Sequence, residues 1–305
     1  MNGKSVKEFI SKLLIESPVN NLKLYFSRWS TNKYITHLPQ LSSELQNEII
    51  DTVLKPLNNL SGDNIVNYNP IGVGDGEIEI LKVSQIEKVG IFFDSIEDSN
   101  VFKELATLKV DKIDFQCIEI SLNGKCIYLF RQFQKLKRLR KGIIAQIVNN
   151  ELKTMSSNFL GIDELTDIII FEKEVYIINH VSLERIFKYR DEFLKKTNEA
   201  LGELLTKNVI VNIEQFTEDC CGDIRVMKRF TDIMTKGRLP LFFDNYDKVA
   251  EIVKYLNLDI NFDSEGKLIY KERSQLFHII NLLSDSYFKT LLAERTGVAK
   301  IEGDL

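Results

Sequence analysis

The Asn-Gly pair at residues 123–124 constrains the fold of this chain strongly. It separates residues 112–120 from residues 126–133, and both flanking stretches are rich in the β-branched and aromatic residues typical of strands. Asn-Gly is the dipeptide preferred in two-residue hairpin turns, so the two strands should pair antiparallel. A second hairpin is predicted from residues 167–171 and 175–180. The middle of the chain should therefore contain a sheet built from β-hairpins.

Beyond residue 181 the apolar spacing becomes helical. We expect a long amphipathic helix over residues 182–206, capped by Ser182. Further helices are predicted at 212–219, 223–237, 245–258, 273–285 and 286–295, with a short hairpin at 259–271. The expected fold class is α+β, with a mixed or antiparallel β-hairpin sheet in the N-terminal half and a helix-rich C-terminal half. The expected domains are a strand-rich α/β portion with a basic hairpin arm at residues 1–180 and a helix-rich portion at residues 181–305.

Composition narrows the class of protein. The net charge of -4 at pH 7 argues against a chain coated in basic residues, although it allows a local basic patch. No run approaches the roughly 18 apolar residues of a membrane span, and the first apolar stretch is too short and charged for a signal peptide. We therefore expect a cytoplasmic protein. The four cysteines form no metal motif and are expected to be reduced.

Catalytic motifs are missing from the sequence. His37, His180 and His278 do not lie at metal-ligand spacing from one another or from a cysteine, so no metal site is predicted. No nucleophile elbow occurs either. We predict no catalytic residue and no cofactor, and a non-catalytic binder is the favoured interpretation.

A metal-dependent nuclease is the first alternative. Such sites gather acidic residues at the ends of paired strands, and Asp114 and Glu119 lie on one predicted strand with Lys125 just past the turn. Side chains five positions apart point to opposite faces of a regular strand, which weighs against this interpretation. The alternative stays open at this stage.

Positive charge is concentrated directly after the first hairpin. The stretch YLFRQFQKLKRLRKG carries six cations and no acid. Phosphate is the commonest partner of such a cluster, because each contact releases condensed counterions. The predicted DNA-binding residues of this cluster are Arg131, Lys135, Lys137, Arg138, Arg140 and Lys141.

A second basic group lies at helical spacing further along the chain. Arg225, Lys228 and Arg229 would share one helix face, and we predict that they join the first cluster in contacting DNA. Nothing in either group indicates base-specific reading, so binding should be largely independent of sequence. A solvated helix face is the alternative interpretation of this group.

The segment LTDIIIFEKEVYIINHVSLERIFKYRDEF, residues 165–193, resembles the central part of the KwaB family of the Kiwa anti-phage system. In that family a strand pair ends in an asparagine, here Asn179, and a helix then opens with a run like the one at residues 183–187. Residues 268–300 are similar to the end of the family's sequence, including its Asp-x-Tyr step, here at Asp285 and Tyr287.

The resemblance implies an anti-phage defence protein that binds DNA through a basic patch. It also implies a small transmembrane partner protein of the Kiwa system and a homo-oligomer, for which we expect a dimer. The partner would recruit this chain from the cytoplasm to the inner face of the membrane. The alternatives are a metal-dependent nuclease of a defence system and a module that binds protein but not DNA.

Overall fold

The structure is a computed structural model whose described residues divide into two compact units. The described residues are 3–15, 22–58, 64–97, 112–133, 145–148, 151–154, 161–290, 292 and 294–299. Unit 1 comprises Met1–Tyr68 and Val73–Lys188, and unit 2 comprises Asn69–Gly72 and Tyr189–Leu305. The units divide at Lys188, whereas the sequence suggested a boundary after residue 180. Within the described residues, no helix is both long and apolar enough to cross a bilayer.

The described part of unit 1 is built around an eight-stranded sheet in the order β2-β1-β5-β6-β9-β10-β4-β3. Its neighbouring strands pair antiparallel, except for β3 and β4, which pair parallel. The sheet is therefore mixed, which confirms the α+β prediction. The strands are β1 (Leu22–Ser30), β2 (Lys33–His37), β3 (Ile65–Asn67), β4 (Ile78–Lys82), β5 (Phe115–Leu122), β6 (Lys125–Gln132), β9 (Ile168–Phe171) and β10 (Glu174–Ile177). A separate two-stranded ribbon pairs β7 (Ala145–Val148) with β8 (Glu151–Thr154).

The predicted hairpin forms at the predicted turn. Leu122 pairs with Lys125, which leaves Asn123 and Gly124 as a two-residue loop between β5 and β6. Their φ angles are +51° and +78°, the left-handed values that a type I′ turn requires at both positions. The Asn-Gly pair thus sets the register of the two central strands.

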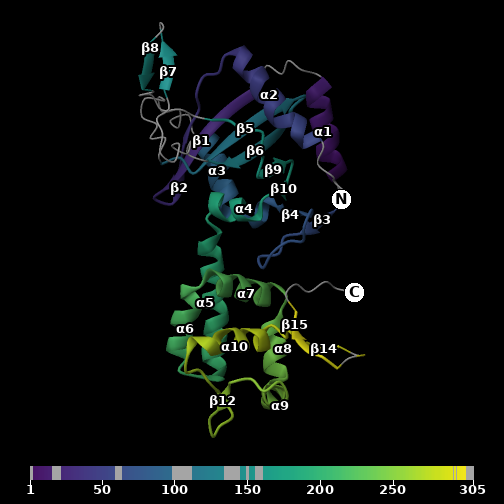
Figure 1. Cartoon of the computed structure of the whole chain (residues 1–305), viewed down its shortest axis with the longest axis vertical. Helices are drawn as coiled ribbons and strands as arrows, with labels where there is room; N and C mark the ends of the chain where they lie inside the picture. The colour runs from purple at the N-terminus through teal and green to yellow at the C-terminus, as the bar shows by residue number, and fades with distance from the viewer. Residues whose placement is uncertain are drawn as a thin grey trace. The chain divides into compact units, whose positions relative to one another are not determined.

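Helices cover both faces of this sheet (Figure 1). One face packs against α1 (Gly3–Ile15) and α2 (Ser43–Asn58), as in the contact between the Phe9 and Phe171 rings, whose centroids are 4.7 Å apart. The other face packs against α3 (Glu87–Glu97), which follows the short 3-10 helix η1 (Val83–Gln85). Successive side chains of a strand point to opposite faces of the sheet, so the strands contribute apolar side chains to both cores.

Aromatic rings fill the second of these cores. Phe92 of α3 is fully buried and contacts Phe115 of β5 and Phe130 of β6 edge-on. Phe187, at the end of α4 (His180–Ile186), packs against Phe130 with a centroid distance of 5.5 Å. α4 is thereby fixed to the face of the sheet that carries α3.

Arg131 clamps the end of β6 to the segment that leads into β9. Its guanidinium donates to both oxygens of Asp163, and its Nη1 donates to Asp167 Oδ1 at 2.9 Å. The second oxygen of Asp167 accepts from the backbone N–H of Gln132 at 2.7 Å. The Asp167 carbonyl also accepts the backbone N–H groups of Ile178 and Asn179, directly before α4. Through its side chain and its backbone carbonyl, Asp167 therefore connects β6, β9 and the residues before α4.

Unit 2 is helical around a second core. Its main helices are α5 (Tyr189–Lys207), α6 (Ile213–Gly222), α7 (Ile224–Thr235), α8 (Arg238–Asp244), α9 (Val249–Tyr255) and α10 (Leu276–Leu283), with 3-10 turns η4 (Tyr246–Lys248) and η5 (Arg273–Gln275). A small sheet has the order β11-β13-β12 and combines β11 (Ile210–Val211), β12 (Asn261–Phe262) and β13 (Leu268–Ile269). The predicted hairpin at 259–271 is confirmed by the antiparallel β12–β13 pair.

Two helix predictions in the C-terminal half are wrong. The helix expected over residues 182–206 is broken at Lys188, which has a φ of +51°, and forms α4 and α5. The cap of α4 is Asn179, whose side chain accepts from the backbone N–H of Ser182. The helix expected at 286–295 is instead a hairpin of β14 (Tyr287–Lys289) with β15 (Thr296–Val298). Strand pairing with residues beyond 295 outweighs the local helical spacing there.

We expect Arg131→Ala to destabilise unit 1 by about 3–5 kcal/mol, because it leaves the buried Asp167 carboxylate without its cation. The matched control is Lys125→Ala on the same strand. Its ion pair with Glu172 is exposed on both sides, so its loss should cost at most about 1 kcal/mol. Chemical denaturation followed by the fluorescence of Trp29, the single tryptophan, reports on this unit. Equal losses in both variants would contradict the clamp.

Candidate nucleic-acid interface

Only one member of the first predicted basic cluster lies among the described residues. Lys135, Lys137, Arg138, Arg140 and Lys141 lie outside the described residues, so their contribution stays a prediction. Phe133, the last described residue before them, packs edge-on against Phe26 in the core of unit 1.

Arg131 is the described member of that cluster, and the fold uses it internally. Its side chain is 11% exposed and is paired with Asp163 and Asp167. Burial alone would lower its pKa, but the two carboxylates outweigh burial and raise it. A phosphate would have to displace a buried carboxylate to reach this guanidinium. Arg131 therefore stabilises unit 1 and does not belong to the candidate interface.

The second predicted basic group is organised by one carboxylate at the start of α7. Asp223 caps this helix by accepting the backbone N–H of Arg225 at 3.0 Å. The same carboxylate accepts from the Arg225 guanidinium at 2.8 Å and from Arg273 of η5 at 3.1 Å. These bonds, led by the one from the Arg225 side chain, hold the pKa of Asp223 far below its usual range. Asp223 is thus a permanent anion that orients two arginines.

Two guanidinium groups lie over the ring of Phe277 on α10. The Cζ atoms of Arg225 and Arg229 lie 5.5 Å and 5.7 Å from its centroid. Arg229 also donates through Nη1 to Asn281 Oδ1 at 2.6 Å, and burial lowers its pKa. Cation–π contact and hydrogen bonding restrict both side chains to defined positions. Rigid cations lose less entropy when they bind an anion.

We call the surface formed by Arg225, Lys228, Arg229 and Arg273 the arginine face; Lys228 and Arg229 are half-buried in it. Arg225 and Arg273 remain 71% and 61% exposed although both are tied to Asp223. The Lys228 ammonium lies 5.8 Å from the centroid of the Phe193 ring, on α5. The three cations predicted at helical spacing all lie on α7, where Arg225 and Arg229 contact the Phe277 ring and Lys228 contacts the Phe193 ring.

Sequence patterns did not reveal Arg273. It comes 50 residues after Asp223 in the chain and is not part of any periodic pattern of basic residues. Lys236 and Arg238, which follow α7, are instead engaged by carboxylates: Lys236 lies 3.1 Å from Asp232, and Arg238 lies 3.8 Å from Asp285.

The arginine face is suited to phosphates. Guanidinium groups match phosphate oxygens in charge and geometry, and two of them are anchored at one point. A partner whose negative charges repeat along a chain would contact several of these cations together.

The acidic residues of the nuclease alternative lie in separate places. The Asp114 carboxylate accepts the backbone N–H of Trp29 at 2.7 Å and pairs with Lys188 at 3.2 Å. Glu119 accepts from Lys23 and Tyr25 on β1. Among the described residues, no group of three or more His, Cys, Asp or Glu side chains could hold a metal ion. Both carboxylates therefore hold β1 to the neighbouring part of the chain.

A buried charge cluster in unit 1 was missed by sequence reasoning. The Nδ1 atom of His180, the first residue of α4, lies 2.7 Å from Glu79 Oε2, and its Nε2 atom lies 2.9 Å from Glu184 Oε1. The Tyr68 ring stacks on the imidazole at a centroid distance of 5.2 Å. Only Glu184, one helical turn away, is a local partner, whereas Glu79 is 101 residues distant in sequence.

The two carboxylates keep this histidine charged. Burial alone would lower the pKa of His180, but the bonds and charges of Glu184 and Glu79 outweigh it and raise the pKa from 6.5 to about 9. The imidazolium therefore ties α4 to β4 across neutral pH, and it does so inside the segment that carries the family-like pattern.

The chain matches the protein-family model described as Kiwa protein KwaB-like over residues 110–293, which is more than half of its length. The matched region contains β5, β6, α4, Asp223 and the whole arginine face. No curated protein and no solved structure matches the chain.

The raised pKa of His180 predicts a loss of stability at alkaline pH. Its contribution should be fully present below about pH 6.5 and should disappear as the pH rises through about 9, with a maximum of about 3 kcal/mol. The difference in unfolding free energy between the wild type and His180→Gln should therefore shrink over this range. Denaturation curves at several pH values, followed by Trp29 fluorescence, measure it, and parallel profiles would refute the assignment.

Proposed function

Because this chain belongs to the Kiwa protein KwaB-like family and so has a role in antiviral defence, we propose that it is a DNA-binding protein of that system. It holds DNA through phosphate contacts, largely without regard to sequence. The observation that carries the proposal is the arginine face, where exposed guanidinium groups are oriented by Asp223 and Phe277 before any ligand arrives.

Charge and geometry support a polyanionic partner. The cations of this face are spread over α7 and η5, so a single small anion would engage only some of them, whereas successive phosphates can engage them together. Phosphates are the part of DNA that these cations would meet whatever the base sequence, so we expect mainly backbone contacts. The chain's charge of -4 limits such contacts to local basic surfaces.

The basic stretch after β6 supplies a second set of phosphate contacts in this proposal. The residues concerned are Lys135, Lys137, Arg138, Arg140 and Lys141, and Arg131 is no longer among them. The Arg131 clamp holds the end of β6, the strand that comes before this stretch in the sequence.

We also propose that the protein acts with a small transmembrane partner protein of the Kiwa system and as a homo-oligomer, a dimer. The partner would recruit it from the cytoplasm to the inner face of the membrane. Family membership supports this part of the proposal. Fractionation of cells with and without the partner tests the recruitment, and light scattering of the purified chain tests the dimer.

DNA binding should weaken steeply with salt. Four phosphate contacts by the arginine face alone correspond to a slope of about -3 to -4 in a plot of log affinity against log salt. Replacing Arg225 and Arg273 by Gln together should make this slope shallower by about 2. A salt-titrated binding assay with duplex DNA of unrelated sequences measures both.

Charge reversal of Lys137, Arg138 and Arg140 together should abolish DNA binding and phage protection while leaving the melting temperature nearly unchanged. The matched control reverses three exposed lysines elsewhere, Lys12, Lys55 and Lys254, which gives the same change in net charge. Unchanged binding in the first variant, or equal loss in the control, would refute the proposed interface.

The nuclease alternative is tested in the same preparations. Linear and circular DNA are incubated with the protein and Mg²⁺ or Mn²⁺, with and without a chelator. We expect intact DNA under each condition. Metal-dependent cleavage that is lost in Asp114→Ala would instead establish the alternative.

A further inference from the structure

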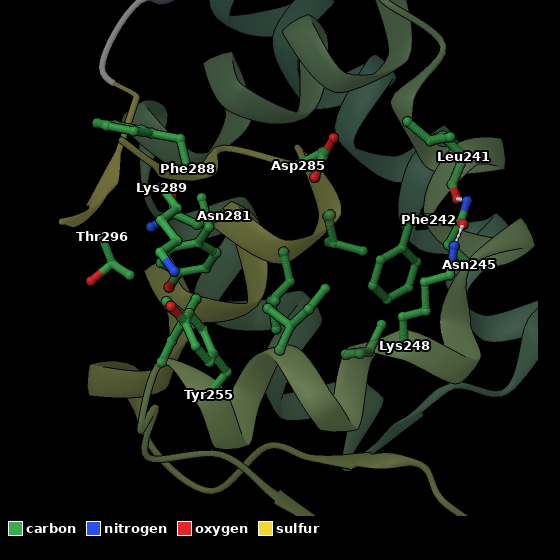
Figure 2. Close-up of a pocket in the computed structure, with 16 residues that line it drawn as sticks. Leu241, Phe242, Asn245, Lys248, Tyr255, Asn281, Asp285, Phe288, Lys289 and Thr296 are labelled. Atoms are coloured by element: carbon green, nitrogen blue, oxygen red, sulfur yellow. Dashed lines mark hydrogen bonds between the residues drawn. The ribbon is translucent and has the colours of Figure 1, made fainter. Parts of the chain in front are cut away.

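Unit 2 contains a pocket that the proposed DNA-binding surface does not use. Figure 2 shows it between α8, α9, the end of α10 and the β14–β15 hairpin. Its volume is about 380 Å³, which lies in the range of pockets that hold small organic molecules.

The walls of this pocket are mainly apolar and are partly open to solvent. Leu241, Ile252, Tyr255 and Phe288 line it, and each leaves more than a third of its surface exposed. The Phe288 ring packs over Gly297 on the neighbouring strand, where a Cβ atom would come within 2.6 Å of it. Water in contact with these side chains would be released by an apolar ligand, which favours binding.

Two ammonium groups lie at opposite ends of the pocket (Figure 2). At one end Lys248 Nζ donates to the neutral amide of Asn245 at 2.7 Å. At the other end Lys289 Nζ lies 5.8 Å from the centroid of the Tyr255 ring and 3.2 Å from Glu294. The Glu294 side chain is 76% exposed, so this ion pair is weak and can exchange for another anion.

The acidic residue of the lining does not cancel this charge. Asp285 Oδ2 lies 3.8 Å from Arg238 Nη1, so its carboxylate already has a cationic neighbour. Asn281 also lines the pocket, but its side-chain oxygen already accepts a hydrogen bond from Arg229 at 2.6 Å. A nucleobase needs free amide edges, whereas an alkyl chain needs only the apolar walls.

We propose that this pocket binds a single-chain anionic amphiphile, a molecule with an alkyl body and one carboxylate head. The body lies along Ile252, Tyr255 and Phe288, and the head meets Lys248 or Lys289. This ligand class follows from the combination of an open apolar wall with ammonium groups at its ends, and it is independent of DNA binding.

Dodecanoate is the test ligand, used below its micelle-forming concentration. Purified full-length protein is first loaded with the fluorescent anion 1-anilinonaphthalene-8-sulfonate, and dodecanoate is then titrated to displace it. Dodecyltrimethylammonium, which has the same chain and the opposite charge, is the comparison ligand. Dodecanoate should bind on the order of tenfold more tightly than the cation.

Three variants locate the site. Lys248→Gln combined with Lys289→Gln should weaken dodecanoate binding on the order of tenfold, and Ile252→Glu should abolish it by placing a carboxylate in the wall. The matched control is Lys254→Gln combined with Lys271→Gln, two exposed lysines of unit 2 outside the pocket, which should bind like the wild type. Circular dichroism verifies that each variant folds.

The proposal would be overturned by no displacement by dodecanoate, by equal affinity for the anion and the cation, or by unchanged binding by Ile252→Glu. Binding only to phosphatidylglycerol vesicles, with none to dissolved dodecanoate, would also overturn it, because the site would then be a membrane contact. DNA affinity measured on the same variants should be unchanged.

Discussion

The ion pair between Arg131 and Asp167 is the interaction on which the arrangement of unit 1 most depends. The Asp167 carboxylate neutralises a buried guanidinium and accepts the backbone N–H of Gln132. Its backbone carbonyl accepts the N–H groups of the two residues that precede α4. A buried ion pair adds little stability compared with well-packed apolar residues, but breaking one partner is costly. The ion pair therefore holds the end of β6 to the residue before β9, and the backbone carbonyl of Asp167 holds the residues before α4.

A second carboxylate organises arginines in unit 2 with the opposite result. Asp223 is buried, like Asp167, yet the side chains of Arg225 and Arg273 that bind it stay largely exposed. Arg131 is enclosed and fulfils a structural role, whereas Arg225 and Arg273 are oriented and displayed. The same pairing chemistry thus gives an internal clamp in one unit and a candidate binding surface in the other. Exposure of the cation decides between these outcomes.

Membership in the KwaB-like family gives the chain its role in antiviral defence. The structure has two surfaces to which we assign the ligands proposed above. The arginine face suits a repeating polyanion. The pocket beside β14 suits a single amphiphilic anion, and its rim lysines are not members of that face. Asn281 contributes to both places, since it lines the pocket and accepts from Arg229. The two surfaces are chemically distinct, so each can be altered while the other is retained.

The sequence by itself determined what depends on neighbouring residues. The Asn-Gly turn has positive φ at both positions, and Arg225 and Arg229 lie over one ring because their spacing places them one helical turn apart. Tertiary structure decided the partners that are remote in sequence: Arg131 with Asp167, 36 residues away, and His180 with Glu79, 101 residues away. It also turned the helix expected at 286–295 into a hairpin. Local spacing cannot reveal whether a cation will meet a buried carboxylate, because that depends on which strands pair and which side chains water can still reach.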